Sequence, residues 1–194
     1  MIHIAMNSTS DIVNIIKGRR NTKRFTNRDV SDKEISVLLD SAVWAPNHRN
    51  TEPWRFFVIR KNSPLRAEIA KELIDIQEKA SGNYLSDIYK QRINDEVQGY
   101  PPFIFVYSLI DEIEEITEEN YGAACCSVQN MQLVATSMGL SVGWSTGKMT
   151  RLKNLQRLLE ITEKLKTVGV LTIGEPQWSI NKGRTSYEEF TKWF

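Results

Sequence analysis

Four basic side chains lie within six residues near the start of the chain: Arg19, Arg20, Lys23 and Arg24. If this segment is extended, Arg19, Asn21 and Lys23 point to the same side, because side chains alternate along a strand. At ~3.3 Å per residue, Arg19 and Lys23 would then stand roughly 13 Å apart. This separation suits a ligand that carries a phosphate at one end and a charge-accepting ring at the other.

Two other interpretations of this basic run remain open. The arginines can interact with the negative C-terminal end of the preceding helix and be followed by a solvated stretch. The other interpretation is a nucleic-acid site. Lys and Arg number 25 against 24 Asp and Glu, so the charge of the whole chain gives no pull toward nucleic acid or an anionic membrane.

A polar loop follows the helical pattern that ends at Trp44. Pro46 stops that pattern, because proline has no N–H and disfavours a helical conformation in the residue before it. Asn47 to Glu52 are all polar, and Phe56 to Ile59 predict a short buried strand. The loop is therefore either an ordinary helix–strand connection or a rigid platform that binds a polar ligand.

Glycines flank a short strand that is predicted after the longest helix. From Gly139 the sequence reads Gly-Leu-Ser-Val-Gly-Trp-Ser-Thr-Gly. Glycines allow a backbone to approach a flat ring closely. The segment does not fit the Gly-x-Gly-x-x-Gly dinucleotide pattern, so on these residues alone a ring-binding segment around Trp144 is a hypothesis.

Amphipathic helices and apolar strands must position these three segments. Ser10 and Ser31 are predicted helix caps, and Glu34 completes a capping box with Ser31. Phe103 to Tyr107 predict a strand that is buried on both faces. Further helices are predicted over residues 11–18, 31–44, 64–80, 118–138, 152–159 and 187–194, with a surface helix within 84–100 and a strand over 168–173.

The composition predicts one globular domain over residues 1–194, because 41% of the residues are hydrophobic. The longest apolar run is about half of a membrane span of ~20 residues, and the N-terminus lacks the pattern of a secretion signal. Cys125 and Cys126 are expected to be reduced, buried thiols. We therefore expect a cytoplasmic protein with no membrane or nucleic-acid partner and, given two distant histidines, no metal site.

Several segments resemble the FMN-dependent nitroreductase family in matching order. The basic run from Arg19 to Phe25 is similar to its Arg-(Arg/His)-Ser-x-(Lys/Arg)-x-Phe pattern. The polar loop resembles the Ala-Pro-Asp-His and Gln-Pro-Trp motifs of its small bacterial branch, with Glu52 in place of the usual Gln. Three later segments also match: Trp144-Ser145-Thr146-Gly147, Ile173-Gly174-Glu175-Pro176 and Lys182-Gly183-Arg184.

The resemblance implies an α+β nitroreductase-like fold, with a central mixed sheet surrounded by helices. It also implies an intertwined homodimer with two FMN sites at the interface. Arg19 and Arg184 would hold the FMN phosphate, Asn21 would bind the ribityl or ring edge, and Lys23 would approach the N1/O2 edge, where a fixed cation favours the reduced flavin. The implied cofactor-binding residues are Arg19, Arg20, Asn21, Lys23, Trp44, His48, Asn50, Trp144, Ser145, Thr146 and Arg184.

The activity implied by the resemblance is a ping-pong reduction. NADH or NADPH passes a hydride to flavin N5, and a nitroaromatic or quinone-like small-molecule acceptor then takes its place. FMN carries this chemistry, so no catalytic residue is expected of the protein. Two alternatives stay open because of Glu52 and residues 84–100: a flavin dehydrogenase for one metabolite, and a flavin-binding or sensing protein without turnover.

Overall fold

A four-stranded sheet forms the centre of the computed structural model, which describes residues 9–152, 154–178 and 183–194. Its strands lie in the order β1–β2–β4–β3. All three pairings within these residues are antiparallel, whereas the resemblance implied a mixed sheet. A parallel pairing would need a strand from outside this part of the chain. The strands are β1 (Trp54–Ile59), β2 (Phe103–Leu109), β3 (Ser141–Ser145) and β4 (Leu165–Gly174).

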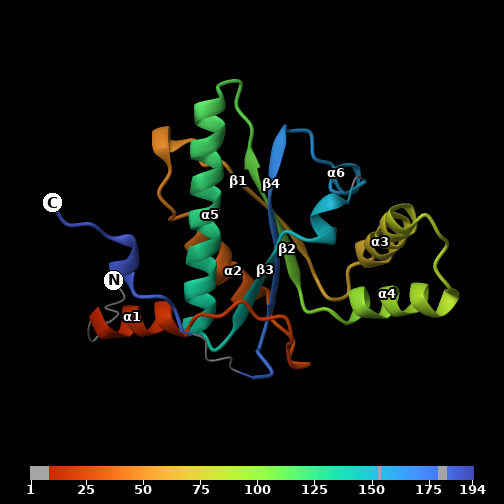
Figure 1. Cartoon of the computed structure of the whole chain (residues 1–194). Helices are drawn as coiled ribbons and strands as arrows, with labels where there is room; N and C mark the ends of the chain where they lie inside the picture. Colours follow the sequence, from red (N-terminus) through yellow and green to blue (C-terminus); the bar gives the residue numbers. More distant parts are fainter. Residues whose placement is uncertain (1–8, 153, 179–182) are drawn as a thin grey trace.

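Helices cover both faces of the sheet, with α2 and α5 on one side and α3, α4 and α6 on the other (Figure 1). The α+β architecture expected from the sequence is therefore confirmed. The described α-helices are α1 (Thr9–Gly18), α2 (Asp32–Ala42), α3 (Leu65–Ser81), α4 (Asp87–Gly99), α5 (Glu114–Ser137) and α6 (Leu155–Leu158). Short 3-10 helices are η1 (His48–Asn50), η2 (Lys148–Arg151) and η3 (Tyr187–Phe190).

Strand β2 explains why the sheet needs two helical layers. Its apolar residues point alternately to opposite faces, as strand geometry requires. Ile104 and Val106 belong to the core beneath α2 and α5. Phe103, Phe105 and Tyr107 belong to the core beneath α3, α4 and α6. The predicted strand buried on both faces is thus confirmed, and it separates two hydrophobic cores.

The starts of the first two helices test the predicted caps. Ser31 caps α2, and its side chain accepts from the Glu34 N–H while the Glu34 carboxylate accepts from the Ser31 N–H, so the capping box is confirmed. Helix α1 begins at Thr9, so Ser10 lies inside the helix and the predicted cap position is wrong. A propensity for capping identifies the residue type but does not fix the first turn.

Three other expectations differ from the structure. Helix α5 begins at Glu114, four residues before the predicted start at 118. Only the 3-10 turn η3 forms within the helix predicted over 187–194, whose described side chains are exposed. Cys125 is half-buried and Cys126 is exposed, so the expectation of two buried thiols is wrong for Cys126. Neither cysteine forms a disulfide.

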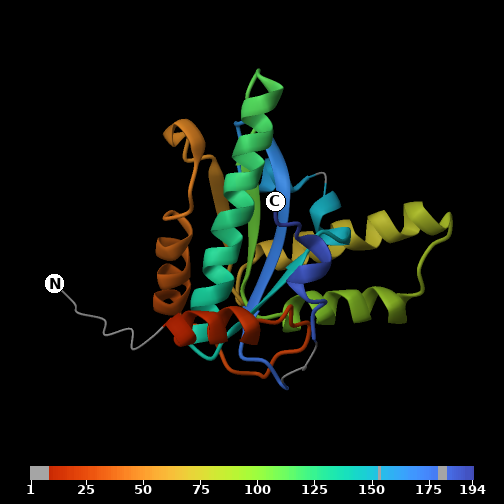
Figure 2. The same cartoon turned by 60° about the vertical axis from the view of Figure 1, so that its left-hand side comes forward.

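The two ends of helix α5 lie beside different segments of the chain. Figures 1 and 2 show α1 beside the C-terminal end of α5 and the loop around η1 beside its N-terminal end. Gly18 approaches Thr136 at the first end, and His48 bonds to Glu119 at the other. At about 1.5 Å per residue, Glu119 and Thr136 lie roughly 25 Å apart along the axis.

In the part of the chain that is described, no helix is long and apolar enough to cross a membrane.

Candidate functional site

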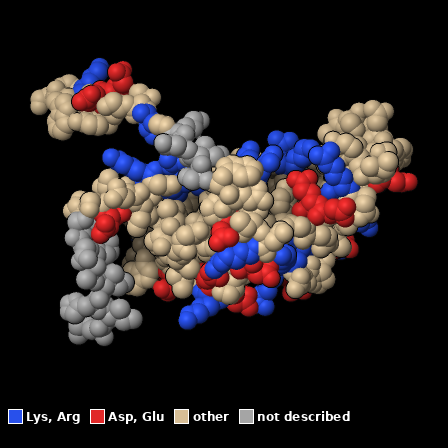
Figure 3. Space-filling view, turned by 90° about the horizontal axis from the view of Figure 1, so that it is seen from below, with Lys and Arg blue, Asp and Glu red and all other residues tan. Residues whose placement is uncertain are grey.

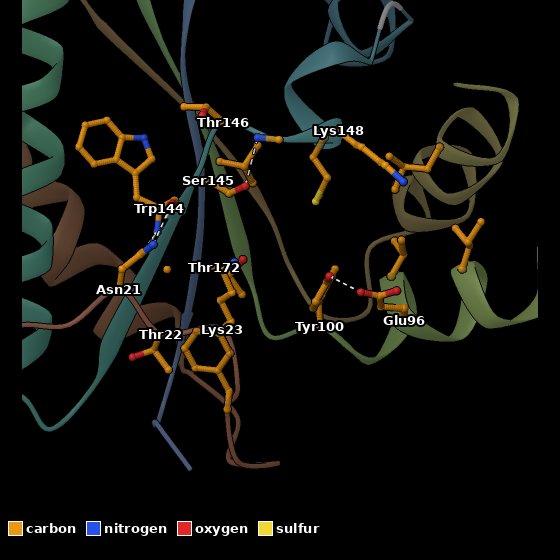
Figure 4. Close-up of a pocket in the computed structure, with 18 of the residues that line it drawn as sticks. Asn21, Thr22, Lys23, Glu96, Tyr100, Trp144, Ser145, Thr146, Lys148 and Thr172 are labelled. Carbon is orange, nitrogen blue, oxygen red and sulfur yellow. Dashed lines mark hydrogen bonds between the residues drawn. The ribbon is translucent and has the colours of Figure 1, made fainter. Parts of the chain in front are cut away.

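A pocket of about 780 Å³ opens between the segment that follows α1, the edge strand β3 and the α3–α4 hairpin (Figure 4). Its volume lies in the range of small-molecule and cofactor sites. The predicted site residues that line it are Asn21, Lys23, Trp144, Ser145 and Thr146. Two predicted segments that are about 120 residues apart in sequence therefore meet at one cavity.

The side chain of Asn21 joins these two segments through hydrogen bonds to a single backbone residue. Its Oδ1 accepts from the Trp144 N–H at 2.6 Å, and its Nδ2 donates to the Trp144 carbonyl at 3.2 Å. The amide thus occupies the place that a neighbouring strand would take beside β3. Asn21 fixes the position of Trp144, a role that the sequence analysis did not assign to it.

Close backbone contact also holds the two segments together. A Cβ atom at Gly143 would overlap with the carbonyl oxygen of Thr22. The Thr22 hydroxyl lies 2.6 Å from the Ser141 hydroxyl, one of the two donating to the other. Glycine is therefore required at position 143 for the basic segment to lie against β3.

The ring of Trp144 is fixed from its other side. Its Nε1–H donates to the Val168 carbonyl at 3.1 Å, where a register shift interrupts the pairing of β2 with β4. A Cβ atom at Gly169 would overlap with this indole nitrogen. The bulge and the glycine together make room for a half-buried tryptophan beside the pocket.

Lys23 stands at the pocket with its charge uncompensated. It is exposed, and it forms no hydrogen bond or ion pair with any residue that the structure describes. Nearby, the Phe25 ring packs against Gly174, and Phe25 forms an isolated bridge with Pro176. The basic segment is thus anchored on both sides of Lys23, which leaves the ammonium group free to face a ligand.

Three arginines lie together just outside the pocket. Burial and the positive charges of Arg184 and Arg20 beside it lower the pKa of Arg19. No ion pair of Arg19 or Arg184 occurs within the described ranges. Arg20 donates to the carbonyls of Lys17 and Arg19, so it caps the C-terminal end of α1. Arg19 and Arg184, two like charges held together with no carboxylate partner among the described residues, indicate a site for an anion. Lys182 lies outside the described residues.

Three predicted site residues lie far from the pocket. Trp44, which follows α2, is 80% exposed, so it is not a core residue. His48 places its Nδ1 2.8 Å from a Glu119 carboxylate oxygen, and Asn50 is exposed with a positive φ. His48 lies beside the N-terminal end of α5, whereas Trp44 lies just after the end of α2, where the Ser41 carbonyl accepts from Asn130 of α5. None of the three residues lines the pocket of the same chain.

The resemblance implied that residues 84–100 cover the substrate side of the flavin, but no residue of the pocket wall opposite β3 was named from the sequence. The residues of this wall recur at helical spacing on α4 and just after it: Tyr89, Arg92, Ile93, Glu96, Val97 and Tyr100. Glu96 accepts from the Tyr100 hydroxyl at 2.7 Å, and burial together with this carboxylate raises the pKa of Tyr100. The spacing of three and four residues would have identified one helix face, but this spacing alone does not show that the face lines a pocket.

Replacing Asn21 by alanine is expected to lower the free energy of unfolding by about 1–2 kcal/mol, because two hydrogen bonds to Trp144 are lost. Urea unfolding of the variant and the wild type measures the difference. Asn62, an exposed asparagine, provides the control: Asn62→Ala should change stability by less than about 0.5 kcal/mol. Equal effects of the two substitutions would contradict the bridging role of Asn21.

Comparison with known proteins adds a family and a set of related structures. A family model described as "Nitroreductase family" matches residues 16–175. The Bacillus subtilis protein named "Putative NAD(P)H nitroreductase YfhC" is 26% identical over 162 residues, which is 84% of this chain and 82% of that protein. A Bacillus cereus crystal structure of a nitroreductase-like family protein is 28% identical, covers 98% of this chain and 99% of its own, and has a TM-score of 0.81.

A second solved structure agrees in fold. The Desulfovibrio desulfuricans protein, crystallised in complex with FMN, is 24% identical, covers 95% of this chain and 96% of its own, and has a TM-score of 0.71. The nitroreductase-like fold expected from the sequence is confirmed by these matches.

Proposed function

This chain belongs to the nitroreductase family, and we propose that it is an FMN-dependent oxidoreductase that passes a hydride from NADH or NADPH to a nitroaromatic or quinone-like acceptor. The observation that carries the proposal is the pair of Arg19 and Arg184 beside a glycine-bordered pocket that also contains Lys23, none of which forms an ion pair with a described residue. This arrangement matches the two charged ends of FMN, a phosphate and an electron-accepting ring.

The phosphate end of FMN fits Arg19 and Arg184. Each guanidinium can donate two parallel hydrogen bonds to phosphate oxygens. Burial and, after it, repulsion by Arg184 and Arg20 lower the pKa of Arg19, and a dianion between the arginines would offset that repulsion. Arg20 contributes its positive charge, while its hydrogen bonds to the end of α1 keep the segment in place. The relative named "Putative NAD(P)H nitroreductase YfhC" supports NADH or NADPH as the hydride donor.

The ring end of FMN fits the pocket. Lys23 supplies a cation, and Ser145 and Thr146 are exposed at the wall formed by β3. When bound, FMN supplies the hydride-transfer chemistry, accepting at N5 from the nicotinamide and donating to the acceptor. Lys23 would stabilise negative charge on the ring edge. The residues of the chain therefore bind, orient and tune, and no general acid is required of them.

We propose that a homodimer completes each site. His48 and the nearby Asn50 lie at one end of α5, and Arg19 and Lys23 lie near the other, with roughly 25 Å of helix between the two ends. Trp44, which follows α2, does not line the pocket either. If one FMN contacts Arg19 and Lys23 as well as His48 and Asn50, then His48 and Asn50 must come from a second copy of the chain. The exposed side chain of Trp44 suits a contact with the second copy. In this proposal, each copy is a single domain formed by residues 1–194.

The purified protein is expected to be yellow, and NADH or NADPH should bleach the flavin absorbance under anaerobic conditions. A nitroaromatic compound should then restore the colour, because it removes the electrons. Arg184→Gln should weaken FMN binding by tenfold or more, since one charge-assisted contact is lost. Arg157→Gln, at an exposed position of α6, is the matched control and should keep the wild-type affinity.

The outcomes of this experiment separate the proposal from its alternatives. A yellow protein that no nicotinamide bleaches would be a flavin-binding protein without turnover. A flavin that is reduced only by one metabolite would indicate a specific dehydrogenase. A colourless protein that does not bind added FMN would overturn all three.

A further inference from the structure

The pocket has a second wall that the proposed FMN contacts do not use. Helix α4 lies across the cavity from β3 and presents Tyr89, Arg92 and Glu96 at spacings of three and four residues. On the same helix, Ile93 and Val97 are buried in the core and hold it against the sheet. The polar stripe of α4 therefore faces the cavity on a fixed support, opposite Lys23 and Trp144 (Figure 4).

The charges on this side of the cavity are not balanced. Arg92 and Lys148 line it, and Glu96 is the only carboxylate among the described lining residues. Lys148 donates to the neutral amide of Gln77 at 2.9 Å, and Glu96 accepts from the Tyr100 hydroxyl. Neither cation forms an ion pair within the described part of the chain. Figure 3 shows Lys and Arg side chains gathered along the upper margin of this view.

Arg92 is the cation best placed to recognise a group of defined shape. Its guanidinium carbon lies 5.9 Å from the centre of the Tyr89 ring, and both side chains are exposed at the rim. A guanidinium presents planar donors that match a carboxylate, while a phenol ring offers an apolar face. Side by side, they fit a ligand that combines a carboxylate with an aromatic ring.

We propose that Arg92 and Tyr89 form a specificity site for electron acceptors that carry a carboxylate on an aromatic ring. The proposal rests on the proposed function, because the acceptor must lie beside the FMN ring. The carboxylate accepts hydrogen bonds from the Arg92 guanidinium, and the aromatic body lies between Tyr89 and the flavin side of the cavity. Lys148 adds a second positive charge to the same wall.

Two acceptors of nearly equal size test the proposal: 4-nitrobenzoate, which is anionic, and 4-nitrobenzamide, which is neutral. The ratio of their kcat/KM values is expected to fall about tenfold in Arg92→Gln, in line with the loss of one charge-assisted hydrogen bond. Arg157→Gln, which changes an exposed arginine that does not line the cavity, should leave the ratio at its wild-type value. Urea unfolding checks that both variants are folded.

Equilibrium binding gives a readout that does not depend on turnover. Calorimetric titration of 4-nitrobenzoate into the purified protein should show a dissociation constant about tenfold weaker in Arg92→Gln, with the wild type preferring it over 4-nitrobenzamide. Absence of turnover with both acceptors would remove the proposed function, yet the titration would still report the carboxylate preference.

Two results would overturn the specificity site. One is an unchanged ratio of kcat/KM values together with unchanged binding of 4-nitrobenzoate in Arg92→Gln. The other is a slower reduction of the flavin by NADH or NADPH in that variant, with the acceptor ratio unchanged. In that case the guanidinium would serve the phosphates of the nicotinamide nucleotide instead.

Discussion

Replacing Gly143 by alanine is expected to weaken FMN binding by at least a hundredfold. The added Cβ atom would overlap with the Thr22 carbonyl oxygen, which belongs to the backbone and cannot rotate away as a flexible side chain could. The basic segment would have to leave β3, and the Asn21–Trp144 and Thr22–Ser141 hydrogen bonds would break. Arg19 and Lys23 would then lose their fixed positions relative to the pocket. Titration of the apoprotein with FMN, followed by flavin fluorescence, measures the affinity.

Gly99→Ala is the control for this substitution. No atom lies within 4 Å of a Cβ built at Gly99, which ends α4 without a positive φ. Alanine there should be neutral or slightly stabilising, because it restricts the unfolded chain. Urea unfolding separates a folded Gly143→Ala protein that has lost FMN from one that has lost its structure. Wild-type FMN affinity in Gly143→Ala would show that the contact with Thr22 does not position the site.

Replacing Arg66 by methionine is expected to lower the free energy of unfolding by about 3 kcal/mol or more. The side chain is fully buried, yet it has no carboxylate partner among the described residues. Burial lowers its pKa to about 10, so it is still charged at pH 7. The guanidinium lies 4.7 Å from the Phe103 ring centre. It donates to four backbone carbonyls, those of Arg60, Val97, Tyr100 and Pro101, at 2.6–2.9 Å.

Methionine would leave these carbonyls without their donor, and an unsatisfied buried polar group is destabilising by about 1–3 kcal/mol. Urea unfolding, with the slope and the midpoint fitted separately, measures the loss. Arg66→Lys keeps the charge but not the planar set of donors, so we expect an intermediate loss. Arg157→Met on the surface should stay within about 0.5 kcal/mol of the wild type. A loss of that small size in Arg66→Met would contradict the role of the four carbonyl contacts.

Local patterns were sufficient to predict much of the fold. The apolar run of β2 and the capping box of α2 depend on residues close in sequence, and both are confirmed. The buried position of Arg66 could not be predicted from such local patterns. In sequence it is one more charged residue on an amphipathic helix, but in the structure it lies at the centre of the packing between α3 and the segment before β2.

The residues of the candidate site likewise fall into those that local sequence patterns indicated and those that they did not. Asn21, Lys23 and Trp144 were selected from their segments, and the structure brings them to one pocket. The sequence did not indicate that the Asn21 amide is bonded to the backbone of Trp144, because that contact spans 123 positions. Arg92 carries no local signal at all, since an exposed arginine on a helix is usually a solvated residue. Trp44, His48 and Asn50 stay predictions that depend on a second copy.

The hydrogen bonds between Asn21 and Trp144 have a consequence for the behaviour of the protein in concentrated solution. Strand β3 is an outer strand of the sheet, and an outer strand offers its unpaired N–H and C=O groups as a template for aggregation. The side chain of Asn21 already occupies both groups of Trp144, and the backbone of Thr22 presses against Gly143. The same short segment that shapes the pocket therefore shields this border of the sheet from recruiting a foreign strand.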